Sequence, residues 1–305
     1  MNLPKFLFVG TAKAGTTSIY HYLRQHPEVS IPVKETFYFM KDVLVDNHLP
    51  YPKQRPLSDL ILTRDEYLKV YADIDKGKTT GEIGTGYLYH HRESIPLIRE
   101  TLGKDVRIAM ILRNPVDRCY SSYQHFTKDL FEDLTFEESL RAEKERKNAG
   151  WDFMWHHLAL GFYAAQVRAY QEAFEHVGVW LYDDLKQDAG ATMKSIARFI
   201  GVTPMDVPTA KTYNPSGKPK SALLQKFITH ENPVKMVLRP VFRTFFDKER
   251  RERIRKGIKS KNLTKSEGPS PEMKNYLREL YQDDVKTLSK LIDRDLDHWI
   301  NPSGT

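Results

Sequence analysis

The sequence lacks several features that would assign it to a familiar class of protein. It has a single cysteine, Cys119, in 305 residues, so no disulfide can form within the chain. No apolar run approaches the roughly 18 residues that a membrane-spanning helix needs, and the N-terminus has no signal-peptide core. We therefore expect a cytoplasmic protein without a transmembrane segment.

Recognisable motifs for binding metals or nucleic acids are also absent. The adjacent histidines at 90–91 and 156–157 do not share one face of a helix or strand, and neither H-E-x-x-H nor C-x-x-C occurs. No zinc-finger, RRM or KH signature accompanies the net charge of +7, which favours anionic partners such as nucleotides and anionic sugars. We expect no metal site and no nucleic-acid partner.

The densest positive charge lies in KERRERIRKGIKSKNLTK, residues 248–265. Glu249 and Glu252 interrupt the basic residues, which is typical of a solvated helix with ion pairs between successive turns. A surface that faces substrate or membrane is the alternative.

Short apolar runs that alternate with helical patterns predict an α/β fold. The expected strands are 5–10, 36–40, 106–112 and 177–182. The expected helices between them are 16–26, 64–74, 92–102, 115–130, 159–176 and 189–200. Strands that alternate with crossover helices along the chain are typical of a parallel sheet covered by helices on both faces.

The composition of the sequence changes after residue 201. The segment 201–221 contains four prolines and two glycines, so we expect a long loop that is either a linker or a functional lid. Further helices are expected at 221–230, at 234–246 and at about 272–293. We expect one domain over residues 1–305, with this loop and a helical C-terminal region, 221–305, as parts of it.

The strongest local signal is FVGTAKAGTTSIYHYL, residues 8–23. An apolar strand runs into Gly10, and Gly15 follows at the spacing of G-x-x-x-x-G-K-[ST], whose backbone amides cradle phosphates. Thr16 stands where that pattern has lysine, and the lysine of the loop is Lys13 instead. A helix that starts near Thr16 still directs its amides at an anion. We therefore expect transfer of a group that needs less charge neutralisation than a γ-phosphoryl group, such as a sulfonate, without a metal.

Two motifs together resemble those of sulfotransferases that use 3′-phosphoadenosine 5′-phosphosulfate (PAPS). Residues 5–29 resemble the 5′-phosphosulfate-binding loop of this family, and MILRNPVDRCYSSY, residues 110–123, resembles its 3′-phosphate-binding motif. VKETFYF (33–39) and GEIGTGYL (81–88) are similar to segments of the carbohydrate or heparan-sulfate branch. Three later segments resemble bacterial members: VWLYDDLKQDAGATMKSIARFIGV, NPSGKPKSALLQ and RDLDHWI. The resemblance covers nearly the whole chain and implies a P-loop-like parallel sheet flanked by helices.

The resemblance assigns residues to both phosphates of the donor. The 5′-phosphosulfate side comprises Lys13, Ala14, Gly15, Thr16, Thr17 and Ser18, and the 3′-phosphate side comprises Arg113, Ser121, Lys218 and Lys220. Lys13 is also the expected catalytic cation, because a fixed ammonium stabilises the negative charge that grows on the leaving phosphate. Arg113 offers phosphate a rigid bidentate fork. A surface lysine and an ion-paired arginine are the structural alternatives.

The acceptor side depends on Glu35, the catalytic base that the resemblance implies. A carboxylate beside the acceptor hydroxyl can take its proton as the sulfonate arrives. Glu82, Tyr87 and His125 are further candidates for the acceptor site, and Glu82 and His125 are competing bases. The structural alternatives are an exposed dipeptide for Glu35, a supporting role for Glu82, and ordinary packing for the other two.

The leading hypothesis is a PAPS-dependent sulfotransferase that transfers sulfonate to a hydroxyl of a sugar, a glycolipid or another small acceptor. One alternative is a nucleotide-dependent kinase with a divergent phosphate loop, against which the missing lysine at position 16 counts. The other is a non-catalytic nucleotide-binding protein, which the intact set of phosphate ligands and base disfavours.

Overall fold

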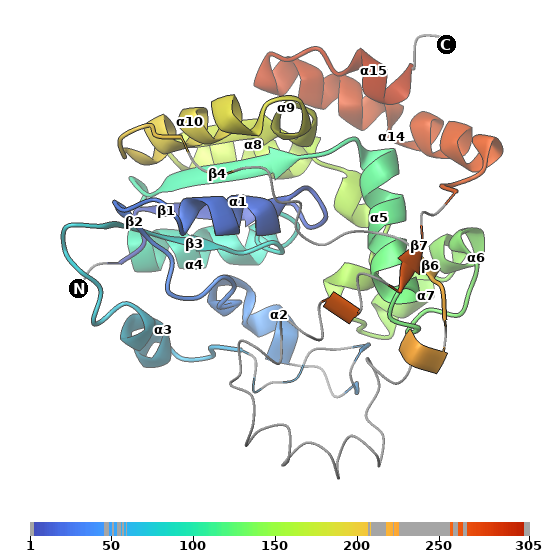
Figure 1. Cartoon of the computed structure of the whole chain (residues 1–305), viewed down its shortest axis with the longest axis horizontal. Helices are drawn as coiled ribbons and strands as arrows, with labels where there is room; N and C mark the ends of the chain where they lie inside the picture. Colours follow the sequence, from blue (N-terminus) through green and yellow to red (C-terminus); the bar gives the residue numbers. More distant parts are fainter. Residues whose placement is uncertain are drawn as a thin grey trace.

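A five-stranded parallel sheet in the order β2-β3-β1-β4-β5 forms the centre of the molecule (Figure 1). The computed structural model describes residues 3–45, 60–206 and 267–301, with short stretches at 49–50, 52–53, 56, 58, 208, 218–221, 223–225, 257–258 and 262–264. The strands are β1 Phe6–Gly10, β2 Val29–Ser30, β3 Thr79–Ile83, β4 Arg107–Leu112 and β5 Val177–Leu181.

The two central strands, β1 and β4, are the most strongly apolar. Every residue of β1 is buried, and so is every residue of β4 except Arg107. A parallel strand that is covered on both faces needs apolar side chains at successive positions, and FLFVG and RIAMIL supply them. The strands predicted at 5–10, 106–112 and 177–182 are confirmed.

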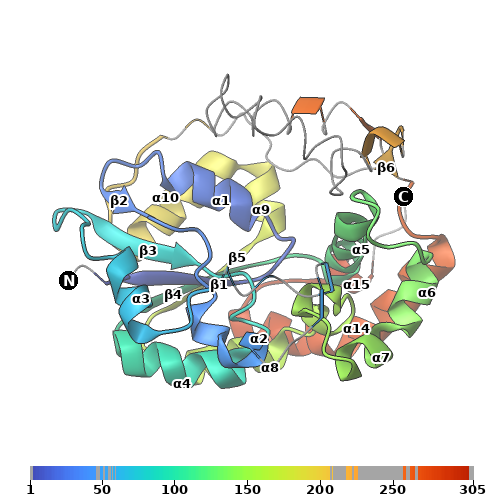
Figure 2. The same cartoon turned by 90° about the horizontal axis from the view of Figure 1, so that it is seen from below.

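Helices cover both faces of the sheet (Figure 2). One face carries α1 Thr16–Leu23, α9 Tyr182–Gln187 and α10 Ala189–Ile200, and the other carries α4 His91–Leu102, α8 Ala164–Ala173 and α14 Pro271–Ile292. Phe6 and Phe8 of β1 pack with α1 and α10. Leu7 and Val9 point to the opposite face and pack in the core that includes α4, α8 and α14. Alternate residues of one buried strand therefore belong to two apolar cores.

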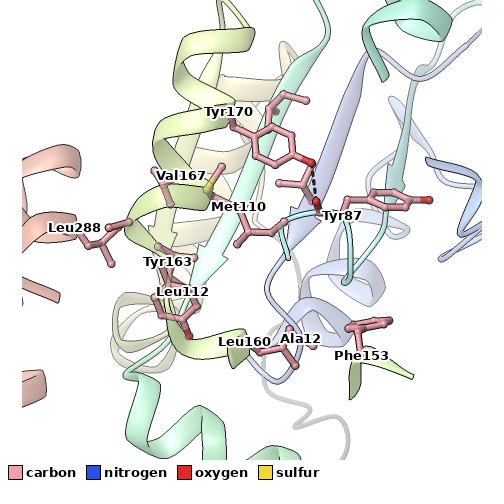
Figure 3. Packing of buried hydrophobic residues seen from close by; sticks show 14 of the residues in the cluster. Ala12, Tyr87, Met110, Leu112, Phe153, Leu160, Tyr163, Val167, Tyr170 and Leu288 are labelled. Carbon is pink, nitrogen blue, oxygen red and sulfur yellow. Dashed lines mark hydrogen bonds between the residues drawn. The ribbon is translucent and has the colours of Figure 1, made fainter. Parts of the chain in front are cut away.

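The second of these cores is rich in tyrosine (Figure 3). Val167 of α8 lies with Met110 of β4 in this core, and the hydroxyl of Tyr170 donates a hydrogen bond of 2.8 Å to the backbone carbonyl of Tyr87. A buried tyrosine hydroxyl needs such a partner. The contact ties α8 to the chain just after β3.

The segment 36–40 is not the strand that its aromatic residues predict. It forms a buried loop that ends in a 3-10 turn, η1 Tyr38–Met40. Its aromatic side chains are buried by packing on helix α3 Arg64–Val70, where Tyr38 stacks on Tyr67 with ring centroids 4.4 Å apart. The strand in this part of the sheet is β3, whose sequence TTGEI has no apolar run. Aromatic residues therefore mark the core here without marking a strand.

Most predicted helices are present, several of them shorter than expected. The helix predicted at 115–130 is α5 Pro115–Thr127, and the one predicted at 159–176 divides into a 3-10 turn, η4 Ala159–Gly161, and α8. The predicted last helix is α14, which begins at Pro271 behind a Ser270 cap. The remaining elements of the described residues are α2 Asp42–Val45, α6 Phe136–Arg141, α7 Glu143–Asn148, η3 Phe153–Trp155, β6 Lys218–Pro219, β7 Leu263–Thr264 and α15 Asp297–Ile300.

Several predictions for the C-terminal third concern residues that the structure does not describe. Most of the loop 201–221, the helices at 221–230 and 234–246, and the basic run 248–265 lie largely outside the described residues. None of the helices that the structure describes is both long enough and apolar enough to cross a membrane.

Candidate functional site

The loop between β1 and α1 presents free backbone amides at the start of a helix. Gly15 is the N-cap of α1, and no side chain caps this helix. Among the described residues, no acceptor takes the backbone N–H groups of residues 13–17. Amides at a helix N-terminus attract anions, because they have no partner within the helix. The predicted ligand segment from Ala14 to Ser18 therefore has the donors that a phosphate or sulfonate group needs.

Gly15 is required at this position for two reasons. Its φ of 90° is a left-handed conformation that side chains rarely adopt. A Cβ atom at this position would also lie 3.0 Å from side-chain atoms of Tyr182 and Leu185, both on α9. The loop is thus pressed closely against α9.

Lys13 stands in the middle of the loop, with a left-handed backbone of φ 71°. Its carbonyl accepts a hydrogen bond of 3.0 Å from Nη1 of Arg113, which helps to hold this conformation. Partial burial, together with repulsion from Lys128 and Arg113, lowers the pKa of Lys13 from 10.5 to about 7. An anion beside Lys13 would offset this repulsion, so the surroundings favour anion binding.

Arg113 follows β4 directly and is held in place from three sides. Besides the bond to Lys13, its guanidinium lies over the ring of Tyr182, 4.8 Å from the ring centroid. Its backbone carbonyl accepts a hydrogen bond of 2.9 Å from the hydroxyl of Tyr163. Its Nε is buried and has no hydrogen-bond acceptor among the residues that the structure describes. A fixed guanidinium with an unused donor is suited to an added anion.

Ser121, the second predicted 3′-phosphate ligand, lies in the middle of α5 and is partly exposed. The side chain of Asn114 caps this helix by accepting a hydrogen bond of 3.0 Å from the backbone N–H of Val116. Pro115 occupies the first helical position, where its missing N–H costs nothing. Ser121 comes six residues after Pro115, so it lies nearly two turns along the helix that follows Arg113.

Glu35 lies in an ion pair with its neighbour Lys34. The Lys34 Nζ to Glu35 Oε1 distance is 2.8 Å, and the side chain of Glu35 is 21% exposed. The hydroxyl of Thr85 donates a second hydrogen bond to the same Oε1 at 3.3 Å. The charge of Lys34 is one of those that lower the pKa of Lys13.

Glu82 and Tyr87 lie inside the protein and do not line a surface. Both are 0% exposed, and the Tyr87 hydroxyl donates a hydrogen bond of 2.5 Å to Glu82 Oε1. Burial raises the pKa of the Glu82 carboxyl, although its hydrogen bonds act in the opposite direction. The arrangement favours the supporting role for Glu82 and the packed role for Tyr87 over direct contact with an acceptor.

His125 lies in the last turn of α5, at the opposite end of the helix from Arg113, and is partly exposed. Lys128, whose charge reaches Lys13, caps the same end of the helix.

The late basic segment is described only around β6 and β7. Lys218 pairs with Thr264 in this antiparallel ladder, and the exposed Lys220 donates its backbone N–H to the carbonyl of Asn262 at 2.6 Å. Gln225 donates a hydrogen bond of 3.1 Å to Asp129, just beyond α5. The segment is thus anchored at the end of α5 that carries His125.

Three residues of this site were not predicted from the sequence. Tyr182 contacts both Gly15 and Arg113, and Thr85 bonds Glu35. Thr36 connects the segment of Glu35 to β3 through Glu82. Tyr182 directly follows β5, and ligand sites of parallel sheets gather at such strand ends, so its position was a usable signal. The two threonines carry no comparable signal.

Comparison with known proteins agrees with this geometry. A family model described as sulfotransferase domain matches residues 3–289. A human bifunctional heparan sulfate N-deacetylase/N-sulfotransferase 2 is 28% identical over 209 residues, which cover 66% of this chain and 22% of that protein. A membrane-associated sulfotransferase, kil1, of Dictyostelium discoideum is 27% identical over 125 residues, 41% of this chain and 23% of that protein. The chain thus spans about a fifth of the length of the curated relatives that it matches.

A solved structure supports the same conclusion over the whole chain. The crystal structure of a sulfotransferase from Alicyclobacillus acidocaldarius is 26% identical and covers 98% of this chain and 99% of its own, with a TM-score of 0.75. The P-loop-like sheet and the resemblance of the sequence motifs are both confirmed. The chain belongs to the sulfotransferase domain family.

Proposed function

We propose that this chain transfers the sulfonate group of PAPS to a hydroxyl or amine of a saccharide or another small acceptor. The observation that carries the proposal is the β1–α1 loop, in which free amides surround Lys13 and Arg113 holds the Lys13 carbonyl. The kinase and the non-catalytic alternatives gain no support from the relatives, which are sulfotransferases by name. The heparan sulfate N-sulfotransferases among them favour an acidic saccharide, and an amine as well as a hydroxyl acceptor.

The residues of the donor side fit the charge of PAPS. The amides of residues 13–17 and the hydroxyls of Thr16, Thr17 and Ser18 are available to the 5′-phosphosulfate. Within the described part of the chain, the buried Nε of Arg113 is a donor without an acceptor, as a 3′-phosphate site requires. We propose that Ser121 also binds the 3′-phosphate, and that Lys218 and Lys220 of the late basic segment do the same. PAPS supplies the sulfonate when it is bound.

Lys13 and Glu35 carry the two charge movements of the reaction. The Lys13 ammonium stabilises negative charge on the phosphate oxygens that the sulfonate leaves, and it acts without rearranging because Arg113 fixes its loop. Glu35 accepts the proton of the acceptor hydroxyl or amine. Lys34 and Thr85 hold the Glu35 carboxylate at one oxygen, Oε1, which leaves Oε2 to receive the proton.

We also propose that residues 1–305 form one domain that works in the cytoplasm, without a metal and without nucleic acid. The family match over 3–289 supports the single domain. So does the core in which Leu277 and Tyr281 of α14 pack with β1 and β4. The single cysteine supports the location.

Binding of nucleotides tests the proposal. Adenosine 3′,5′-bisphosphate should raise the melting temperature, whereas ATP or GTP with Mg²⁺ should not, because position 16 has no lysine for a γ-phosphate. At about 100 times its dissociation constant a ligand stabilises the protein by roughly 2.7 kcal/mol. Equal stabilisation by ATP with Mg²⁺ would overturn the assignment.

A further inference from the structure

The buried carboxylate of Glu82 is surrounded by hydrogen-bond donors. It lies on β3, is 0% exposed, and accepts five hydrogen bonds. Oε1 accepts from the Thr36 hydroxyl (2.6 Å), the Thr36 backbone N–H (3.3 Å) and the Tyr87 hydroxyl (2.5 Å), and Oε2 from the hydroxyls of Tyr71 (3.0 Å) and Tyr67 (3.1 Å). A buried charge is costly, and only such a complete set of partners offsets the cost.

Two of these five bonds reach the residue that follows Glu35. The same Thr36 hydroxyl accepts a hydrogen bond of 3.2 Å from the backbone N–H of Tyr38, so it also fixes the start of η1. On the other side of Glu35, the carbonyl of Lys34 accepts a hydrogen bond of 3.0 Å from the backbone N–H of Ile83. Residues 34 and 36 are therefore both fastened to β3, and Glu35 lies between the two attachments.

The carboxylate is itself fixed by the packing around it. Tyr67 lies on α3 and Tyr71 directly follows this helix, and their rings meet edge to face with centroids 5.1 Å apart. The backbone of Tyr87 is held by the Tyr170 hydroxyl of α8 (Figure 3). The α3 segment, and α8 through Tyr87, thus help to immobilise the carboxylate that holds Thr36.

We infer that Glu82 and Thr36 are positioning residues that aim the carboxylate of Glu35 at the acceptor, an inference that rests on the proposed function. A buried network whose only purpose is stability could be replaced by apolar packing, as in the rest of this core. Here the network ends on the segment that carries the base. Misplacing a reacting group by about 1 Å can cost about 100-fold in rate, so the attachment matters for turnover.

Two variants separate positioning from stability. Thr36→Val removes the hydroxyl that donates to Oε1 of Glu82 and that belongs to the residue after Glu35. Tyr71→Phe removes a hydroxyl that donates to Oε2 of Glu82. Both should lower the melting temperature. Thr36→Val should lower kcat by about 10- to 100-fold while the affinity for adenosine 3′,5′-bisphosphate stays unchanged. Tyr71→Phe should keep kcat within about twofold of the wild type, because the Tyr67 hydroxyl still holds Oε2. Thr36→Ser keeps the hydroxyl donor to Oε1 and should retain most of the wild-type turnover.

The double variant Glu35→Gln/Thr36→Val shows whether Thr36 acts through Glu35. It should lose no more turnover than Glu35→Gln alone, because an absent base cannot be misplaced further. Normal turnover in Thr36→Val, an equal loss in Tyr71→Phe, or losses that add in the double variant would each overturn the inference.

Crystal structures of the two single variants give a readout that does not depend on activity. The Glu35 carboxylate should leave Thr85 in Thr36→Val and keep that contact in Tyr71→Phe; an unmoved carboxylate in Thr36→Val would contradict the positioning role. A wild-type protein that binds the nucleotide but transfers no sulfonate would instead refute the proposed function, and the structures would still decide the positioning.

Discussion

The donor side and the acceptor side of this site are built in different ways. The proposed donor side is a continuous loop, residues 10–18, to which we assign binding through backbone amides and Lys13, and Arg113 bonds the Lys13 carbonyl from a distant part of the chain. The proposed acceptor side depends on the carboxylate of Glu35. Thr85 bonds this carboxylate directly and Glu82 anchors its segment through Thr36, and these two residues lie 50 and 47 positions from Glu35 in the chain. A binding site made of backbone amides can be encoded by one short stretch of sequence, whereas a site that depends on a positioned side chain needs the tertiary fold.

The difference predicts that donor binding and proton removal can be damaged separately. The largest expected effect belongs to Glu35→Gln, which keeps the shape of the side chain and removes its basicity. General-base catalysis is worth about 10²–10⁴ in rate, so turnover should fall by that factor while the affinity for adenosine 3′,5′-bisphosphate changes little. Steady-state kinetics and calorimetry would measure the two quantities. If Glu35→Gln kept near-normal turnover and His125→Ala abolished it, the base would be His125.

Lys13→Ala tests the catalytic part of the donor side. Loss of one preorganised stabilising group costs about 10²–10³ in rate, so kcat should fall by that factor at saturating PAPS. Lys104→Ala is a suitable control, because Lys104 is an exposed lysine paired with Glu175. Unchanged turnover in Lys13→Ala would mean that the leaving phosphate is stabilised elsewhere.

Arg113→Ala tests the binding part of the donor side, because it should mainly weaken the affinity for the nucleotide. A lost charge-assisted hydrogen bond costs roughly 1.5–3 kcal/mol, about 10- to 100-fold in the dissociation constant of adenosine 3′,5′-bisphosphate. Arg113→Lys should be intermediate, because it keeps the charge and loses the planar fork that lies over Tyr182. Titration calorimetry would decide, and an affinity equal to that of the wild type would exclude Arg113 as a phosphate ligand.

The affinity for the nucleotide should also depend on pH through Lys13. Its pKa is about 7 in the free protein, and an anion favours the ammonium, so binding raises this pKa and takes up a proton above pH 7. Affinity should therefore be full below pH 7 and fall by at most about tenfold for each pH unit above it. Lys13→Ala should lose this dependence between pH 7 and 9, and an identical slope in both proteins would assign it to another group.

The smallest expected effect is that of a chelator. Backbone amides, Lys13 and Arg113 supply the positive potential on the donor side, so EDTA should leave turnover unchanged. A loss of transfer that Mg²⁺ restores would contradict this expectation and favour the hypothesis of a nucleotide-dependent kinase.

The contrast between the two sides also explains what the sequence could predict. The phosphate loop was predictable because a strand, two spaced glycines and a helix start are adjacent in the chain. The helix after Arg113 was predictable for the same reason, from Asn114 and Pro115 at its start.

The acceptor side was predicted only through its resemblance to a family. Aromatic residues made 36–40 look like a strand, whereas tertiary packing on α3 buries them in a loop. The true strand, TTGEI, carries a buried carboxylate that only the distant donors Thr36, Tyr67 and Tyr71 make tolerable. No local sequence pattern predicts such a set of hydrogen-bond partners.

Transfer of radiolabelled sulfonate tests the central claim most directly. The wild-type protein would be incubated with PAPS labelled in its sulfonate group and with heparan-type saccharides whose amines are either free or acetylated. We expect label in the saccharide and an equal amount of adenosine 3′,5′-bisphosphate, and the comparison of the two saccharides separates amine from hydroxyl acceptors. Binding of the nucleotide without transfer to any saccharide or small hydroxyl acceptor would contradict the proposed function.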